Sequence, residues 1–166
     1  MARPRSRWGG DPRSTSGSLV HRVEIDVKSL AQSGRAFPWP KPEVCLGCGG
    51  VRLWGHGFVE AWFDGYDAPL SLRRYRCPDC RLVIRLRPAA YWRRFRASIE
   101  VIRTALLQRL RHGRWPPGLH TSRARHWMCG LRRQVAAHLG MRWRQRLDEG
   151  FERLDTRGIC PVSRSV

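Results

Sequence analysis

The chain has 166 residues, a formal net charge of +19 and a pI near 11.5, and 30 of its 32 basic residues are arginine. Its length allows one modest domain or two very small ones, and the basic surplus favours a polyanionic partner, most simply nucleic acid. No stretch approaches the ~20 apolar residues of a membrane span, and residues 1–17 lack the apolar core of a secretory signal. We therefore expect a cytoplasmic protein without a membrane partner.

Residues 1–42 are predicted to be a disordered basic tail that carries a short strand and a proline-rich linker. The tail, residues 1–19, is rich in Gly, Pro, Ser and Arg. Apolar and polar residues alternate over residues 20–27, which predicts a strand. Three prolines surround Trp39, so residues 31–44 are predicted to be an extended linker.

Two Cys-x-x-Cys pairs, Cys45/Cys48 and Cys77/Cys80, are separated by 28 residues. A two-residue gap lets a tight turn direct both sulfurs at one ion, and Gly47 and Pro78 are turn residues inside the two gaps. The alternative is a set of disulfide-bonded or ordinary buried cysteines, which the intracellular character disfavours. The spacing predicts one structural zinc ion with these four ligands.

Residues 43–90 are predicted to form a zinc ribbon of short antiparallel strands. Strand-like stretches occupy residues 51–54, 58–63, 70–75 and 82–86. Hairpin turns are predicted at residues 55–57 and 64–65. His56 falls in the first of these turns, and because four cysteines already fill a tetrahedral site, we interpret it as a turn residue.

Residues 91–157 show helical spacing and residues 158–166 are predicted to be a frayed tail, so the fold class is α+β. Apolar residues from Tyr91 to Leu110 recur at steps of three and four, and Gly113 ends this first helix. A second helix is capped by Thr121 or Ser122 and closed by Gly140, and a third pattern covers residues 143–154. Two helices joined by a short break are compatible with a helix-turn-helix.

Arginines are concentrated in the helical region, since residues 91–146 contain fourteen arginines and one acid, Glu100. The alternative to a binding surface is a helical bundle, or a strand face, whose arginines are simply solvated. Exposed tryptophans can stack on bases, although most are expected to fill the small cores. The predicted nucleic-acid contacts are Arg73, Arg74, Arg76, Arg93, Arg94, Arg96, Arg123, Arg125, Arg132 and Arg133.

The sequence offers no convincing catalytic constellation, so we expect a binding protein and not an enzyme. The nucleophile-elbow, phosphate-loop and His-Glu-x-x-His motifs are absent. Asp64, Asp67 and Asp79 are interpreted as turn residues, and a four-thiolate zinc site leaves no open coordination position. Cys129 and Cys160 are expected to be free thiols.

Three motifs together resemble a known group: Cys45-Leu-Gly-Cys48, the Leu-Trp-Gly-His-Gly run from Leu53, and the Arg-Tyr-Arg-Cys-Pro-Asp-Cys run that ends at Cys80. They are similar to the zinc-ribbon proteins that accompany, or begin, bacterial insertion-sequence transposases, including small members of unassigned function. The resemblance covers residues 43–112, more loosely 121–133. It implies DNA binding with the four cysteines as zinc ligands. The nuclease domain of full transposases has no counterpart here, so the expectation is a stand-alone or truncated mobile-element protein.

Two other partners fit the same composition. A basic zinc-ribbon protein can bind RNA or the ribosome, and a ribbon can also serve as a protein-interaction subunit or a homo-oligomer contact. Competition between duplex DNA and structured RNA separates the first alternative from DNA binding.

Overall fold

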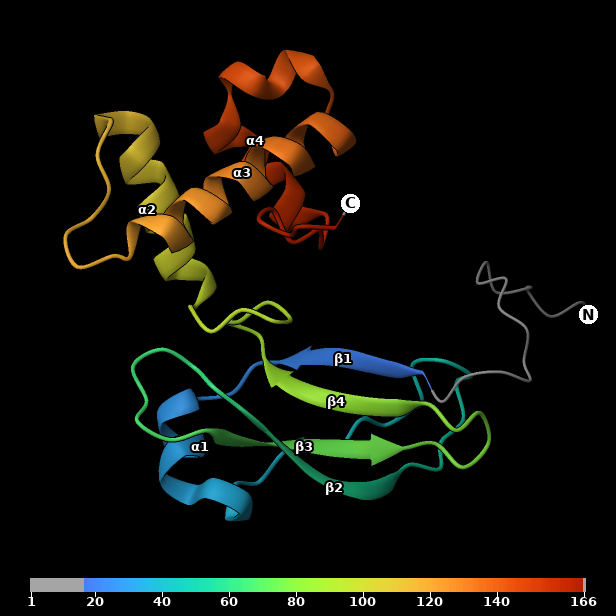
Figure 1. Cartoon of the computed structure of the whole chain (residues 1–166). Coiled ribbons are helices and arrows are strands. Elements are labelled where there is room, and N and C mark those ends of the chain that lie inside the picture. The colour runs from blue at the N-terminus through green and yellow to red at the C-terminus, as the bar shows by residue number, and fades with distance from the viewer. Residues whose placement is uncertain (1–16, 166) are drawn as a thin grey trace, which may run out of the picture. The chain divides into compact units, whose positions relative to one another are not determined.

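The computed structural model describes residues 17–165, which form two compact units divided between Ala89 and Ala90 (Figure 1). The first unit is built on a mixed sheet and the second on helices, which confirms the predicted α+β class. The expected disorder of residues 1–16 lies outside the described residues.

The first unit contains a four-stranded sheet in the order β1-β4-β3-β2 (Figure 1). The strands are β1 (Ser18–Val23), β2 (Trp54–Ala61), β3 (Leu70–Arg76) and β4 (Val83–Pro88). β1 runs parallel to β4, whereas β4, β3 and β2 pair antiparallel. The largest fully buried side chains of this unit are Leu30, Phe63, Leu72, Ile84 and Leu86.

The segment before the cysteines is ordered where we predicted a tail and a linker, at residues 17–36. The predicted strand 20–27 is shifted, because Asp26 caps a helix instead: its carboxylate accepts hydrogen bonds from the backbone N–H groups of Lys28 and Ser29. This helix, α1 (Val27–Ser33), buries Leu30 completely and is followed by the 3₁₀ turn η1 (Gly34–Ala36). The sheet unit therefore begins before residue 43, with β1 as an edge strand.

The predicted turn at residues 55–57 is wrong. Two short strands were expected on either side of it, but they form one strand, β2, with a bulge between Gly55 and Phe58. Gly57 has φ +70, and this conformation lets the strand absorb the extra residue and continue. The turn predicted at residues 64–65 is present, with Gly65 at φ +87.

The second unit contains α2 (Ile99–His112), α3 (Thr121–His138), the 3₁₀ segment η2 (Met141–Gln145) and α4 (Leu147–Thr156). The apolar periodicity predicted the inner faces: Ile102 and Leu106 of α2, Leu131 and Val135 of α3, and Phe151 of α4 are all nearly inaccessible to solvent. These side chains form one apolar core.

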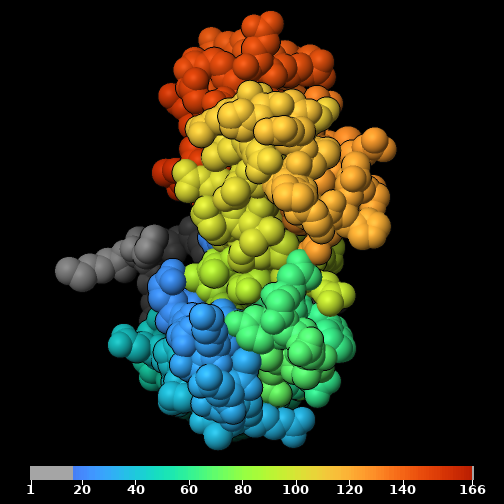
Figure 2. Space-filling view, turned by 90° about the vertical axis from the view of Figure 1, so that its left-hand side faces the viewer, coloured from blue at the N-terminus to red at the C-terminus, as the bar shows by residue number. Residues whose placement is uncertain are grey.

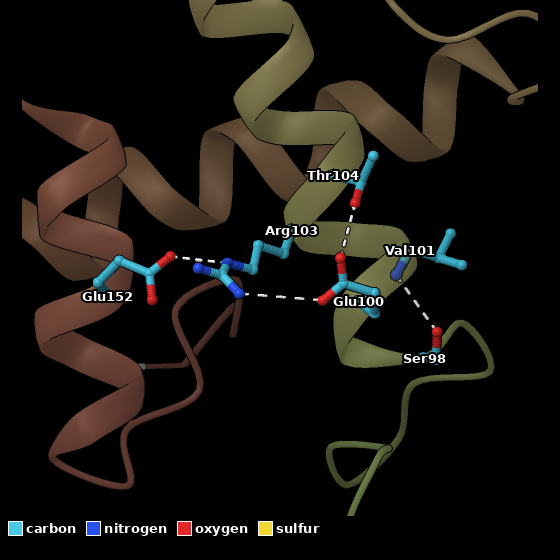
Figure 3. Close-up of polar contacts among 6 residues, drawn as sticks. All are labelled: Ser98, Glu100, Val101, Arg103, Thr104 and Glu152. Atoms are coloured by element: carbon cyan, nitrogen blue, oxygen red, sulfur yellow. Dashed lines mark hydrogen bonds and ion pairs between the residues drawn. The ribbon is translucent and has the colours of Figure 1, made fainter.

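The first of these helices begins later than predicted, at Ile99 and not near Tyr91. The side chain of Ser98 caps it by accepting a hydrogen bond from the backbone N–H of Val101 (Figure 3). Arg94, at φ +69, has a left-handed conformation that a helix cannot contain. Gly113 ends α2 in the left-handed conformation, as expected.

An ion-pair network joins α2 to α4 on the surface (Figure 3). The Nε of Arg103 lies 2.7 Å from Oε1 of Glu152, and its Nη1 lies 3.9 Å from Oε2 of Glu100. All three side chains are substantially exposed, so each pair contributes less than about 1 kcal/mol. The apolar core, and not this network, holds the two helices together.

The C-terminal segment is packed, whereas a frayed tail was predicted from residue 158. Val162 is 2% exposed, and the buried amide of Gln134 donates hydrogen bonds to the carbonyls of Ser163 and Ser165 at 3.1 and 2.8 Å. Gly130 allows this close approach, because a Cβ built there would lie 2.4 Å from the carbonyl oxygen of Val162.

We predict that Gly130→Ala destabilises the second unit by about 1–3 kcal/mol, because the added methyl group must displace the segment at Val162. The direction of the change in the free energy of unfolding distinguishes a packed segment from a frayed one. If the segment were frayed, alanine inside a helix would stabilise α3 by about 1 kcal/mol. Thermal unfolding of Gly130→Ala and of the neighbouring exposed-site control Cys129→Ala measures the difference. A rise in melting temperature for Gly130→Ala contradicts the packing.

Candidate metal centre and arginine surfaces

The pairing of β2 with β3 brings the two Cys-x-x-Cys turns together. Cys45 and Cys48 lie in the loop before β2, and Cys77 and Cys80 lie in the turn between β3 and β4. Trp54, the first residue of β2, pairs with Arg76, the last residue of β3. The segments that carry the two turns therefore meet at one end of the sheet.

The four cysteine sulfurs form one cluster and could hold a metal ion. All four Sγ atoms lie within 4.8 Å of one another. Cys45 Sγ is 3.5 Å from Cys80 Sγ, and Cys48 Sγ is 3.6 Å from Cys77 Sγ. Tetrahedral zinc with Zn–S bonds of about 2.3 Å requires sulfurs about 3.8 Å apart. The cluster therefore has nearly the dimensions of a four-thiolate site, and it contains the four residues predicted as ligands.

Backbone hydrogen bonds shape both turns. In the first turn Cys45 N–H donates to the carbonyl of Gly50 and Gly49 N–H donates to the carbonyl of Cys45, both at 2.8 Å. In the second turn Cys77 N–H donates to the carbonyl of Leu82 at 3.0 Å. The Gly47 N–H also points at Cys45 Sγ, at 3.4 Å.

Each turn contains one left-handed residue directly after its second cysteine. Gly49 has φ +74 and Arg81 has φ +62. Glycine adopts this conformation without strain, whereas the same conformation costs roughly 1–2 kcal/mol for an arginine. The second turn is therefore strained at a position where the first is not.

The thiols of the metal-free cluster differ in acidity. Burial, together with the contacts of Cys80 with the other three cysteines, raises the pKa of Cys80 to about 12, although the backbone hydrogen bond with Leu82 opposes the shift. Burial also disfavours ionisation of Cys77, but the N–H groups of Cys80 and Asp79 outweigh it and lower the pKa of Cys77 to about 7. Four crowded sulfurs cannot all carry negative charge unless a cation neutralises them.

An ion pair between Arg52 and Asp79 links the region after the first turn to the second turn. Asp79, which we predicted as a turn residue, thus has a second role. Its carboxylate lies against Gly50, where a Cβ would come within 2.7 Å of Oδ2. His56, which we interpreted as a turn residue, lies instead inside β2, and it is not part of the cysteine cluster.

One face of the sheet carries a group of arginines from three strands, which we call the sheet arginine face. The strand register places Arg74 opposite Arg85 and Arg87 opposite Arg22, all on the same side as Arg76. The paired positions on this face contain no acidic residue. The Nε atoms of Arg74 and Arg85 are buried without a hydrogen-bond acceptor among residues 17–165.

The structure thus sorts the three arginines predicted on β3. Arg74 and Arg76 belong to the sheet arginine face, whereas Arg73 points to the opposite side and stacks on Phe58, 4.7 Å from the ring centre. Sequence reasoning missed Arg22, Arg85 and Arg87. Alternation along each strand was visible in the sequence, but the register that joins the three strands was not.

The other predicted contacts fall in the second unit. Arg93, Arg94 and Arg96 are exposed, but they lie in the irregular segment before α2 and not on a helix. On α3, Arg125 and Arg132 are exposed, while Arg133 donates to the carbonyl of Arg164 at 2.7 Å and Arg123 stacks on Trp127 at 5.2 Å.

Comparisons with known proteins add no relative: no family model, no curated protein and no solved structure matches the chain. Within residues 17–165, none of the helices has the length and apolar character needed to cross a bilayer.

We predict that the chain binds zinc more weakly as the pH is lowered from about 8 to about 5, because binding must displace protons from the thiols and acid restores them. Competition with a chromophoric chelator across this range measures the affinity. Cys77→Ser should lose tight binding and Cys160→Ser should keep it, and an affinity independent of pH would rule out thiolate ligands.

We also predict that Gly49→Ala weakens zinc binding by roughly 1 kcal/mol, about fivefold, since only the backbone conformation opposes a Cβ there. Arg81→Gly is the matched change in the other turn and removes strain, so it should leave the affinity unchanged or higher. Chelator competition on both variants tests this. Equal weakening by the two substitutions would show that the left-handed conformation is not what matters.

Proposed function

We propose that this protein binds DNA and that a structural zinc ion, held by Cys45, Cys48, Cys77 and Cys80, maintains the sheet that presents the contact surface. The observation that carries the proposal is the sheet arginine face: Arg22, Arg74, Arg76 and Arg85 come from three strands of the sheet whose end carries the cysteine cluster, and no acid stands at the paired positions of this face. The fifth arginine of this face, Arg87, is 6% exposed and stacks on Phe63, so it does not belong to the contact surface.

The choice of zinc rests on the donor set. Four thiolates in a near-tetrahedral arrangement suit zinc, and they leave no coordination position for a substrate. The metal would add a cross-link to the small hydrophobic core of the first unit. Because four thiolates leave no coordination position for a substrate, we propose a binding role and not an enzymatic one. Magnesium-dependent nicking of supercoiled DNA by the purified protein would overturn this.

The choice of nucleic acid rests on unsatisfied positive charge. Arg74 and Arg85 face each other across β3 and β4, and like charges in this position repel. Phosphate groups would supply the missing negative charge. Trp54, 62% exposed and paired with Arg76, offers a flat surface beside these charges on which a base can stack.

The helical unit would add contacts to the phosphate backbone through Arg125 and Arg132 of α3. We do not propose a helix-turn-helix in its usual form, because the loop of residues 113–120 between α2 and α3 is longer than the three- or four-residue turn of that motif. DNA is preferred to RNA because of the motif resemblance to transposase-associated ribbons, which also favours a cytoplasmic location.

We predict that binding to random duplex DNA falls steeply with salt. Arg74→Gln/Arg76→Gln should reduce the slope of log K against log salt by about 2, close to 0.9 per lost phosphate contact. Arg142→Gln/Arg144→Gln makes the same change of charge on exposed residues of η2 and should have little effect.

Fluorescence anisotropy of labelled duplex over a salt series provides the measurement. Equal losses in the two double variants would mean that net charge alone attracts DNA. Tighter binding to structured RNA than to duplex DNA at equal salt would transfer the proposal to RNA.

A further inference from the structure

A cavity of about 460 Å³ opens on the second unit, where the C-terminal turns of α2 meet the loop after it and the start of α3. Figure 2 shows these segments on one surface, α2 and the loop in yellow beside the first part of α3 in orange. Small-ligand sites have volumes of about 300–1,000 Å³, so the cavity has the size of such a site. Its lining is Arg109, Leu110, Trp115, Thr121, Arg125, Met128, Cys129 and Arg132.

The cavity is strongly basic. Three guanidinium groups line it, and no acidic residue does. Neither Arg125 nor Arg132 has an ion-pair partner among the described residues. Arg109 is held in place, because it donates to the carbonyl of Gly113 and stacks on Trp115 at 5.6 Å. Three cations in one cavity repel each other until an anion binds.

The N-terminus of α3 adds a second, independent feature that favours an anion. His120 occupies the N-cap position but its side chain makes no capping hydrogen bond, so the first N–H groups of α3 have no side-chain partner. Thr121, the first residue of this helix, lines the cavity. Uncapped N–H groups at a helix start are suited to phosphate.

The remaining lining residues are mainly apolar. Trp115, Leu110 and Met128 offer an indole, an alkyl chain and a thioether. A purely inorganic anion would leave these side chains unused, whereas a ligand with a phosphate and an aromatic ring would use both parts. We propose that the cavity binds a nucleoside 5′-phosphate, either as a free nucleotide or as the 5′-phosphorylated end of a DNA strand.

The second of these sources rests on the proposed DNA-binding function, and the first does not. A free nucleotide would make the protein sense a small molecule through the helical unit. A strand end would direct the protein to DNA breaks or cleaved termini.

Cys129 provides a direct probe, because it is exposed and lines the cavity. We predict that adenosine monophosphate slows alkylation of Cys129 about tenfold at ten times its Kd, since the free fraction falls as 1/(1 + [L]/Kd). Cys160 lies outside the cavity lining and should react at an unchanged rate. Mass spectrometry of the zinc-loaded full chain reports both thiols in one sample.

The controls separate the two parts of the ligand. Inorganic phosphate and adenosine, each at matched ionic strength, should protect Cys129 much less than the nucleotide does. Arg125→Gln/Arg132→Gln should weaken nucleotide protection at least about tenfold, because each lost guanidinium removes charge-assisted hydrogen bonds. Arg142→Gln/Arg144→Gln, with the same change of charge elsewhere in this unit, should retain it. Both altered sites are exposed, and a thermal melt verifies folding.

Absence of protection by adenosine monophosphate, or equal protection by phosphate alone, overturns the proposal, and neither result depends on a variant. Stronger protection by a 5′-phosphorylated oligonucleotide than by its 5′-hydroxyl counterpart identifies the strand end as the source. Equal behaviour of the two oligonucleotides, with protection by the free nucleotide, identifies the nucleotide.

Closed circular duplex, which has no strand ends, tests the DNA-binding proposal separately. Protection of Cys129 by the nucleotide, without binding to circular DNA, would refute the proposed function and support this inference. Binding to circular DNA without protection by the nucleotide would support the proposed function and refute this inference.

Discussion

The convergence of four cysteine sulfurs at one end of the sheet is the constraint on which the first unit depends. The two turns that supply them are separated by 28 residues of sequence, and β2 and β3 form the path between them. A shared ion would close this loop and lower the entropy of the unfolded chain, as any cross-link over a long loop does. Because β4 follows Cys80 almost directly and β1 pairs with β4, the same constraint reaches across the whole sheet.

The arginines of this protein have two different uses. Some contribute to the structure: Arg146 and Arg153 both stack on Trp143, at 5.1 and 4.6 Å from the ring centre, and Arg73 stacks on Phe58. Such pairs bury the arginine stem and are worth about 0.5–1 kcal/mol each at exposed sites. Others have no acidic neighbour: Arg74 lies opposite Arg85 on the sheet arginine face, and Arg125 and Arg132 line a cavity that contains no acidic residue. These are the arginines that we propose contact an anion.

Local features of the structure could be predicted from the sequence, and features that join distant segments could not. The cysteine turns, the helix end at Gly113 and the buried residues of α3 follow from spacing within a few residues. The helix caps at Ser98 and Asp26 are also local features, but the sequence patterns misplaced both boundaries. The apolar periodicity began before Ser98, and the strand-like alternation continued beyond Asp26. Caps override periodicity when their hydrogen bonds form.

The errors with functional meaning were all non-local. The bulge at Gly57 and the grouping of Arg22, Arg74 and Arg85 depend on strand register, which no single strand specifies. Arg109 joins Arg125 and Arg132 only because α2 and α3 fold together. The packing of Val162 against Gly130 left a faint sequence signal, a glycine inside a helical pattern, which is often a sign of close approach.

The central claim, that four thiolates hold one zinc ion, is tested most directly by X-ray absorption at the zinc edge on the purified full chain. The expected result is a single shell of four sulfur atoms at about 2.3 Å from the zinc. A shell containing nitrogen or oxygen, or a protein that carries no stoichiometric metal when folded, would contradict it.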